Sequence, residues 1–109
     1  MTEEFINVGS YQIEPLKAQN WMPWKRCMLA IFRDLGLEKY IEPNTEPLES
    51  DDEKKKWKEG DAKTRAHIEL AISDAEMVHI MGAVTARQML ENLTTVKESK
   101  GRLGILAAC

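Results

Sequence analysis

The chain of 109 residues is long enough for one domain with a modest core, and its 43% apolar and 30% charged residues are typical of a folded globular protein. The net charge of −3 argues against a compact nucleic-acid-binding domain, because such domains are usually basic. Residues 1–15 lack the continuous apolar segment of a secretory signal, and no apolar run approaches the roughly 20 residues of a membrane helix. We therefore expect a cytoplasmic protein without a membrane partner.

Residues 1–19 are predicted to form an extended arm. Apolar residues alternate loosely there, and Gly9 and Pro15 interrupt them, which favours extended chain with a short strand around Tyr11–Ile13. Apolar side chains in such an arm are expected to pack either against their own domain or against a neighbouring copy of the chain. The candidates for an interface between copies are Phe5, Ile6, Val8, Tyr11 and Ile13.

The first helix is predicted over Trp21–Leu35. Asn20 suits its N-cap, Pro23 is tolerated in its first turn, and Gly36 suits a left-handed C-cap. Apolar residues recur at i, i+3 and i+4, which indicates a stripe facing the core. The stripe consists of Trp21, Trp24, Cys27, Met28, Ile31, Phe32 and Leu35. Cys27 is accordingly expected to be a buried thiol without a disulfide partner.

A helical turn over Leu37–Ile41 and a loop over residues 42–50 should lead into a second long helix, which we expect to end near Ile72. Ser50 and Glu53 have the spacing of a capping box at its start. The residues of its main inward stripe are Trp57, Thr64, Ile68, Ala71 and Ile72. Ala62, Ala66 and Leu70 form a second stripe, so the later turns should lie between two neighbours.

Two features of this second helix need separate interpretation. Its early turns hold four lysines among residues 54–58 and four acids among residues 51–59, so the segment is locally neutral and indicates a solvated face. Gly60 costs about 1 kcal/mol relative to Ala inside a helix, and a bend near it is plausible.

A short helix is predicted over Ala75–Met81, with Asp74 as its cap. An α-helical period would turn Met77, Val78 and Met81 toward the core. Methionines fill cores more often than they form binding surfaces, and the same holds for the tryptophans of the chain.

Two more helices are predicted after Thr85, which has Gln88 at the capping-box position. The fourth helix should pack through Ala86, Met89, Leu90 and Leu93. Polar residues 96–99 should end it, and Ser99 should cap a last helix that is cut short at Cys109. These elements predict an all-α fold, a compact bundle of about five helices over residues 20–109 behind the N-terminal arm.

The sequence contains no pattern typical of a catalytic, cofactor-binding or metal-binding site. His67 and His79 lie on different predicted helices, and neither has a Cys or His partner at metal-ligand spacing. The glycine-rich phosphate-binding motifs and the GxSxG nucleophile motif do not occur. We therefore expect a protein that is not an enzyme and needs no cofactor.

Several short boxes succeed one another in a characteristic order. Asn20, Trp21 and Trp24 form an Asn–aromatic–x–x–Trp box, and the Pro-bearing loop EPNTEP comes later. The Ala-rich segment IELAISDAEMVHI precedes a Thr-Ala box at Thr85 and Ala86. In this order and spacing, residues 13–109 resemble the Gag polyprotein of copia-type LTR retrotransposons. The family often has Trp where Met89 or Leu90 stands, and this chain has no aromatic residue there.

The resemblance implies a domain like the N-terminal domain of retroviral capsids, whose partners are other copies of itself in a homo-oligomeric lattice. RNA would be bound only by parts of the parent protein outside these residues, chiefly a zinc knuckle. A domesticated Gag-derived module that binds peptide or protein partners in the host is the alternative. A nucleic-acid-binding helical domain using Lys97, Lys100 and Arg102 is a further competing interpretation, which the acidic balance disfavours.

Overall fold

The computed structural model describes residues 5–8, 10–42 and 49–108. Helices dominate these residues, and a two-stranded hairpin joins them, so the fold is mainly helical but not purely all-α. The elements in chain order are β1 (Ile6–Val8), β2 (Tyr11–Ile13), α1 (Trp21–Leu35), the 3-10 helix η1 (Glu38–Tyr40), α2 (Asp51–Leu70), the 3-10 helix η2 (Asp74–His79) and α3 (Ala86–Ala108).

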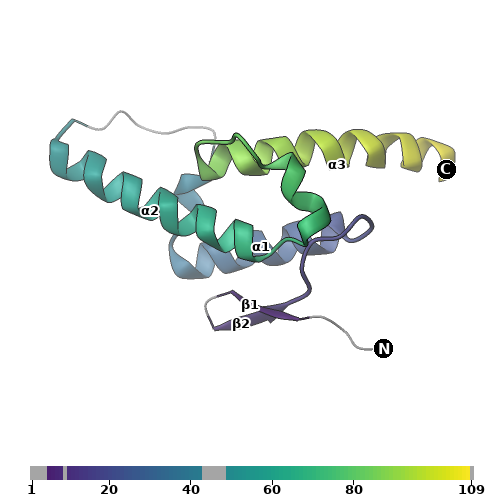
Figure 1. The fold of residues 1–109 in the computed structure, drawn as a ribbon, viewed down its shortest axis with the longest axis horizontal. Helices are drawn as coiled ribbons and strands as arrows, with labels where there is room; N and C mark the ends of the chain where they lie inside the picture. The colour runs from purple at the N-terminus through teal and green to yellow at the C-terminus, as the bar shows by residue number, and fades with distance from the viewer. Residues whose placement is uncertain (1–4, 9, 43–48, 109) are drawn as a thin grey trace.

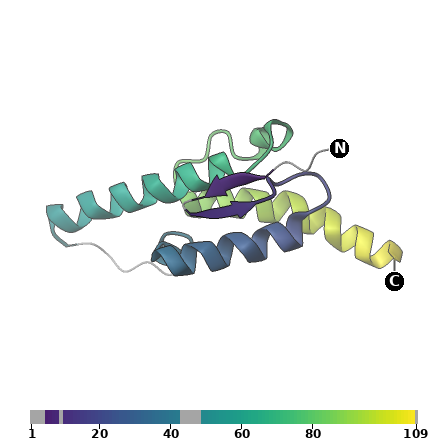
Figure 2. The ribbon, with the colours of Figure 1, turned by 90° about the horizontal axis from the view of Figure 1, so that it is seen from below.

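The helices form two sides of an elongated molecule of 49 × 31 × 24 Å. Figure 2 shows α1 along one side and α2, followed by η2, along the other. The hairpin covers one face of this arrangement, where β2 contacts α1 and β1 contacts α2 (Figure 1). The core therefore lies between α1, α2, α3 and the hairpin.

Most of the residues predicted for the core are buried. Phe32, Met28 and Ile68 are fully enclosed, and Leu16 joins them although it precedes the first helix. The other predicted core residues that are buried are Trp21, Trp24, Ile31, Ile72, Leu90 and Leu93. Leu35 and Trp57 differ from the prediction because they are only partly buried against the core. Cys27 is exposed, so the expectation of a buried thiol is wrong.

The N-terminal arm folds back as a hairpin instead of running out as a single extended segment. Its two strands are antiparallel, with Ile6 opposite Ile13. The chain after the hairpin is fixed by Leu16, whose N–H donates to Ala71 O at 2.8 Å and whose carbonyl accepts from Ser73 N at 3.1 Å. The arm is thus held by backbone hydrogen bonds to the segment after α2.

The capping predictions are only partly correct. Ser50 Oγ accepts from Glu53 N at 3.1 Å, and Thr85 Oγ1 accepts from Gln88 N at 3.0 Å, as the capping boxes predict. Asn20 does not cap α1 with its side chain. Its amide oxygen instead accepts from Lys17 N at 2.6 Å, which orders the turn before the helix. Gly36 ends α1 at φ 75°, as expected for a left-handed C-cap.

The two C-terminal predictions require correction. The segment predicted as an α-helix over Ala75–Met81 is a 3-10 helix, whose period of three residues turns different side chains outward. The mostly polar residues 96–99 do not end the last helix, because α3 continues through them from Ala86 to Ala108. One helix therefore replaces the two that the sequence predicts after Thr85.

Candidate interaction surfaces

The outer side of α1 carries a shallow apolar depression of about 480 Å³. Met22 is 64% exposed there, although the helix buries its opposite side in the core. The lining residues of this α1 depression are Met22, Pro23, Lys25, Arg26 and Leu29. Leu29 is partly buried against the core, so Met22 is the large apolar side chain that this depression leaves open to a partner.

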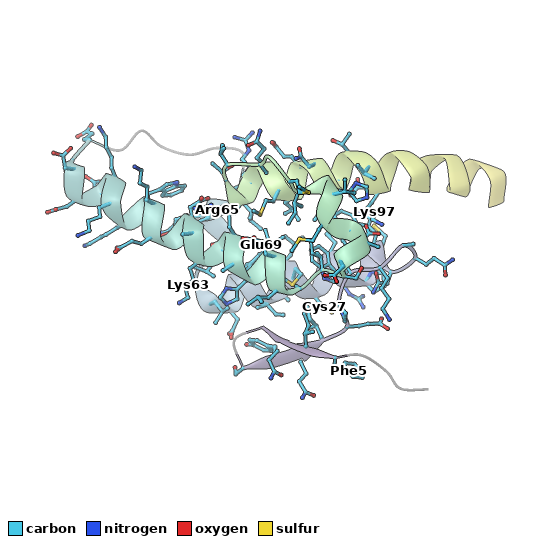
Figure 3. The ribbon with its side chains drawn as sticks, viewed as in Figure 1. Phe5, Cys27, Lys63, Arg65, Glu69 and Lys97 are labelled. Atoms are coloured by element: carbon cyan, nitrogen blue, oxygen red, sulfur yellow. The ribbon has the colours of Figure 1, made fainter. Side chains whose placement is uncertain are left out.

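A second depression of about 260 Å³ lies between α1 and the hairpin. Phe5, Ile13, Pro23, Trp24 and Cys27 line it, together with Gln12, Glu14 and Asn20. Figure 3 shows Phe5 and Cys27 on the hairpin side of the molecule. Pro23 lines both depressions, so the two are adjacent along the first turns of α1.

Figure 2 shows η2 and the segment after it on the opposite side of the molecule from α1. This segment exposes four apolar side chains, which we call the η2 ridge. The ridge consists of Ala75, Val78, Met81 and Val84, spaced three residues apart. Within η2 this spacing places Ala75 and Val78 on one face, because a 3-10 helix repeats every three residues. Val78, Met81 and Val84 are 64–74% exposed, so the prediction that Val78 and Met81 face the core is wrong.

The five interface candidates of the N-terminal arm are placed differently from one another. Phe5 is 54% exposed and lines the depression beside α1. Ile6 and Tyr11 are partly buried against the core, and Ile13 is a buried core residue. Val8 lies in β1, and its side chain is outside the described residues. Phe5 is therefore the arm residue that the described structure leaves most available to a partner.

A buried ion pair, which no sequence pattern indicates, joins η2 to α3. Lys97 Nζ lies 2.5 Å from Glu76 Oε1, and both side chains are less than 10% exposed. Among the described residues Glu76 Oε1 lacks an aligned hydrogen bond, so the charge of Lys97 holds it in place, and the His79 ring lies 3.7 Å away. Lys97 Nζ also donates to Lys17 O at 3.3 Å. Lys97 is therefore not available to bind a nucleic acid. The side chains of Lys100 and Arg102, the other two residues of the nucleic-acid interpretation, lie outside the described residues.

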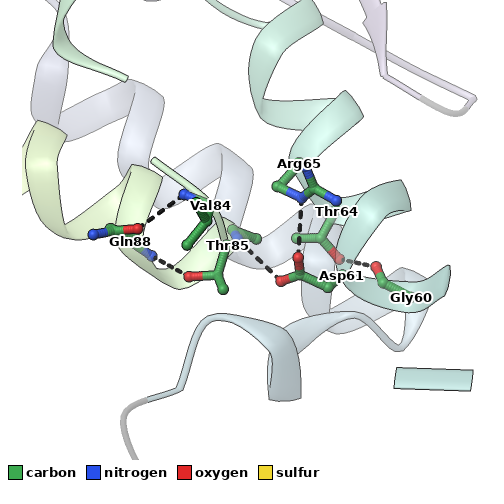
Figure 4. A network of polar contacts seen from close by, with 8 residues as sticks. Gly60, Asp61, Thr64, Arg65, Val84, Thr85 and Gln88 are labelled. Carbon is green, nitrogen blue, oxygen red and sulfur yellow. Dashed lines mark hydrogen bonds and ion pairs between the residues drawn. The ribbon is translucent and has the colours of Figure 1, made fainter. Parts of the chain in front are cut away.

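A second buried carboxylate links α2 to the start of α3 (Figure 4). Asp61 is 6% exposed, and its two oxygens accept from Ala86 N and from Arg65 Nε, each at 3.0 Å. Ala86 is the first residue of α3, whose N-terminal N–H groups favour a negative charge. The partner of Asp61 lies 25 residues further on in the chain, and no local sequence pattern points to this contact.

The polar groove between α1 and α3 has a volume of about 570 Å³, with Ile41 and Leu90 among its lining residues. Its two cationic side chains are already engaged. Lys25 Nζ lies 2.7 Å from Glu98 Oε2, and Arg87 Nε lies 3.1 Å from Glu91 Oε2. The groove consequently offers apolar and hydroxyl contacts more readily than charge to a ligand.

Tyr11 is the titratable group that stands out near these surfaces. Its hydroxyl donates to Asp34 Oδ2, and this hydrogen bond to a carboxylate raises the pKa of Tyr11 above 10.0. Across residues 5–8, 10–42 and 49–108, no three His, Cys, Asp or Glu side chains are grouped to hold a metal ion. None of the helices in the same ranges has the length and apolar character to cross a membrane.

No protein-family model, curated protein or solved structure matches this chain.

Proposed function

We propose that the chain is the N-terminal capsid domain of a copia-type retrotransposon Gag polyprotein, which acts in the cytoplasm by binding other copies of itself. The observation that carries the proposal is the presence of exposed apolar surfaces on opposite sides of one small domain, the α1 depression and the η2 ridge. A domain with two such surfaces can contact two neighbours at once, which a particle wall requires. The proposed role is structural and involves no catalysis.

The boxes that resemble Gag also have a consistent role in the fold, which supports the proposal. Trp21 and Trp24 stack with ring centroids 5.8 Å apart, and the Trp24 indole N–H donates to Ala71 O at 2.8 Å. Ala71 belongs to the Ala-rich box, so two boxes separated by 47 residues meet in the core. The Thr-Ala box starts α3, where Asp61 receives the N–H of Ala86. The resembling residues thus form the framework that joins all three long helices.

The complete gene product that contains this chain provides the test of the proposal. When it is expressed in cells, electron microscopy should show closed particles, and antibodies against this domain should label them. A gene product that remains soluble and unassembled at high expression would contradict the capsid role. A purified chain that binds RNA with strong salt dependence would instead favour the nucleic-acid interpretation.

The alternative is a Gag-derived host module that binds an extended peptide. The groove between α1 and α3 is the observation that favours it, because apolar Ile41 and Leu90 lie beside Thr94 and Thr95, whose hydroxyls can bond to a peptide backbone. The two functions are distinguished by the domains encoded downstream in the parent reading frame. Protease and polymerase domains there would indicate an active element, whereas their absence would favour the host module.

A further inference from the structure

The α1 depression and the η2 ridge each expose apolar side chains that a partner can cover. The depression is concave, with a volume of about 480 Å³ and a floor that includes Pro23 and Leu29. On the ridge, Met81 is 74% exposed, and Val78 and Val84, at three-residue spacing on either side of it in the sequence, are also exposed. An exposed, flexible Met side chain adapts readily to an apolar recess. A projection on one side of a molecule and a recess on the other are the geometric requirements for a head-to-tail contact.

The two surfaces also carry opposite charge. Residues 21–32 include Lys25 and Arg26 and no acidic residue, and because Lys25 is paired with Glu98, the free positive charge at the rim of the α1 depression is that of Arg26. Residues 69–85 include three carboxylates and no Lys or Arg, and two of those carboxylates, Glu69 and Asp74, are exposed. Within the described parts of the chain, Lys25 is paired with Glu98, while no ion pair is formed by Arg26 or Asp74. Arg26 at the depression and Asp74 beside the ridge are therefore each available to pair with a charge on the other surface.

The same charges disfavour a contact between two identical surfaces. Two α1 depressions placed face to face around a twofold axis would bring two cationic rims together, and two ridges would bring two acidic segments together. Like charges that meet in an interface weaken it and suppress that mode of pairing. A contact between different surfaces satisfies the shape and the charge at the same time.

We propose that the η2 ridge of one copy sits in the α1 depression of the next copy, with Asp74 facing Arg26 across the contact. This inference rests on the proposed self-association and specifies which surfaces perform it. Because α1 and η2 lie on opposite sides of the domain, each copy uses one surface for each of two neighbours (Figure 2). Such a contact extends into a row or closes into a ring and does not stop at a dimer.

Two variants that each block one surface provide the test. Met22→Asp places a charge in the depression, and Met81→Asp places a charge on the ridge. Both side chains are more than 60% exposed, so neither substitution should disturb the fold. Ala62→Asp is the matched control, because Ala62 is exposed on α2 and belongs to neither the depression nor the ridge. The exposure of Ala62, Ala66 and Leu70 also shows that the prediction of a second packed stripe on α2 is wrong. Each blocking variant should raise the apparent dissociation constant by about tenfold or more, and the control should leave it unchanged.

The decisive sample is an equal mixture of the two blocking variants in sedimentation velocity. Each variant alone should be monomeric, but the intact ridge of Met22→Asp should bind the intact depression of Met81→Asp and form a one-to-one dimer that grows no further. A wild-type chain that associates while the mixture stays monomeric would overturn this inference and leave the proposed function intact. Association of Met81→Asp with itself would also overturn it, because it would indicate a contact between like surfaces.

Charge exchange tests the orientation of the contact. Arg26→Glu and Asp74→Lys should each weaken self-association, because each brings like charges together. Mixing the two variants should restore binding, since the cationic ridge of Asp74→Lys then meets the acidic rim of Arg26→Glu. Wild-type chain that remains monomeric at millimolar concentration would overturn this inference, and a complete gene product that also forms no particles would overturn the proposed function itself.

Discussion

Asp61 is the single side chain that most directly couples two helices, because it is buried and receives both Ala86 N–H and the Arg65 guanidinium. Asp61→Ala leaves a buried N–H without a partner and removes a charged hydrogen bond. We expect a loss of about 2–3 kcal/mol in the free energy of unfolding, measured with urea. Glu91→Ala is the control, since its exposed pair with Arg87 should contribute less than about 0.5 kcal/mol. Equal losses for the two variants would contradict this role of Asp61.

The buried pair of Glu76 and Lys97 should show strong coupling between its two members. Lys97→Met alone leaves a buried carboxylate without its main partner, and we expect a loss of about 3–5 kcal/mol. Replacing both residues, with Glu76→Leu added, should recover most of that stability because no buried charge is left unpaired. A double variant as unstable as the sum of the two single variants would show that the residues act independently.

Tyr11 should titrate at higher pH than an ordinary tyrosine. The difference in tyrosinate absorbance between wild type and Tyr11→Phe isolates its ionisation, which we expect at higher pH than in an ordinary tyrosine because the hydroxyl donates a hydrogen bond to the Asp34 carboxylate. The folded state holds this proton more tightly than the unfolded state, so the associated stability is present below the unfolded pKa and declines as the pH rises through the folded pKa. In the Asp34→Asn variant, the upward shift should be largely removed. An unchanged titration in that variant would exclude Asp34 as the cause.

At the scale of elements, a substitution of Gly60 tests how η1 packs against α2. A Cβ at position 60 would overlap the ring of Tyr40, which is 9% exposed and packs at a tilted angle against Trp57 with centroids 4.6 Å apart. Gly→Ala inside a helix normally stabilises by about 1 kcal/mol, but here we expect Gly60→Ala to destabilise by about 1–3 kcal/mol. Adding Tyr40→Ala should make the same glycine replacement favourable. A stabilising Gly60→Ala in the wild-type background would contradict this packing.

The elements also show how far local sequence signals reach. The regular stripe from Trp21 to Phe32 and the capping pair of Ser50 and Glu53 are local signals, and the structure contains the helices that they predict. The sequence predicts the second strand of the hairpin but not the first. The strands have only three residues each, and their pairing depends on non-local packing. The ridge is not predicted because an α-helical period does not describe a 3-10 helix, which sends Val78 outward.

Local sequence patterns also fail to predict that α3 is continuous and how it connects to the other helices. The polar residues near position 97 suggest that the helix ends there. In the structure the helix continues, and Lys97 forms an ion pair with Glu76 inside the fold. Likewise, Leu16 is buried because its backbone bonds to the segment after α2, about 55 residues away in the chain. The predicted N-terminal interface residues illustrate the same limit, since Ile13 belongs to the core and Phe5 does not.

At the scale of the whole molecule, the capsid role depends on whether the domain associates through surfaces on opposite sides. Weak contacts that repeat between identical domains build large assemblies without a large interface at any one site. The proposed contact combines apolar burial with the Arg26–Asp74 pair, so it should weaken only partly in high salt, because ions screen the charges and not the apolar contact. Complete loss of association in high salt would indicate that charge alone holds the copies together.

Sedimentation equilibrium of the purified chain over a range of concentrations is the most direct test of self-association. We predict that the average mass rises steadily from the monomer value of 12.5 kDa and passes the dimer without a plateau as the concentration approaches millimolar. A mass that stays at the monomer value throughout this range would contradict a self-associating capsid domain. A mass that levels off at the dimer would contradict the head-to-tail contact.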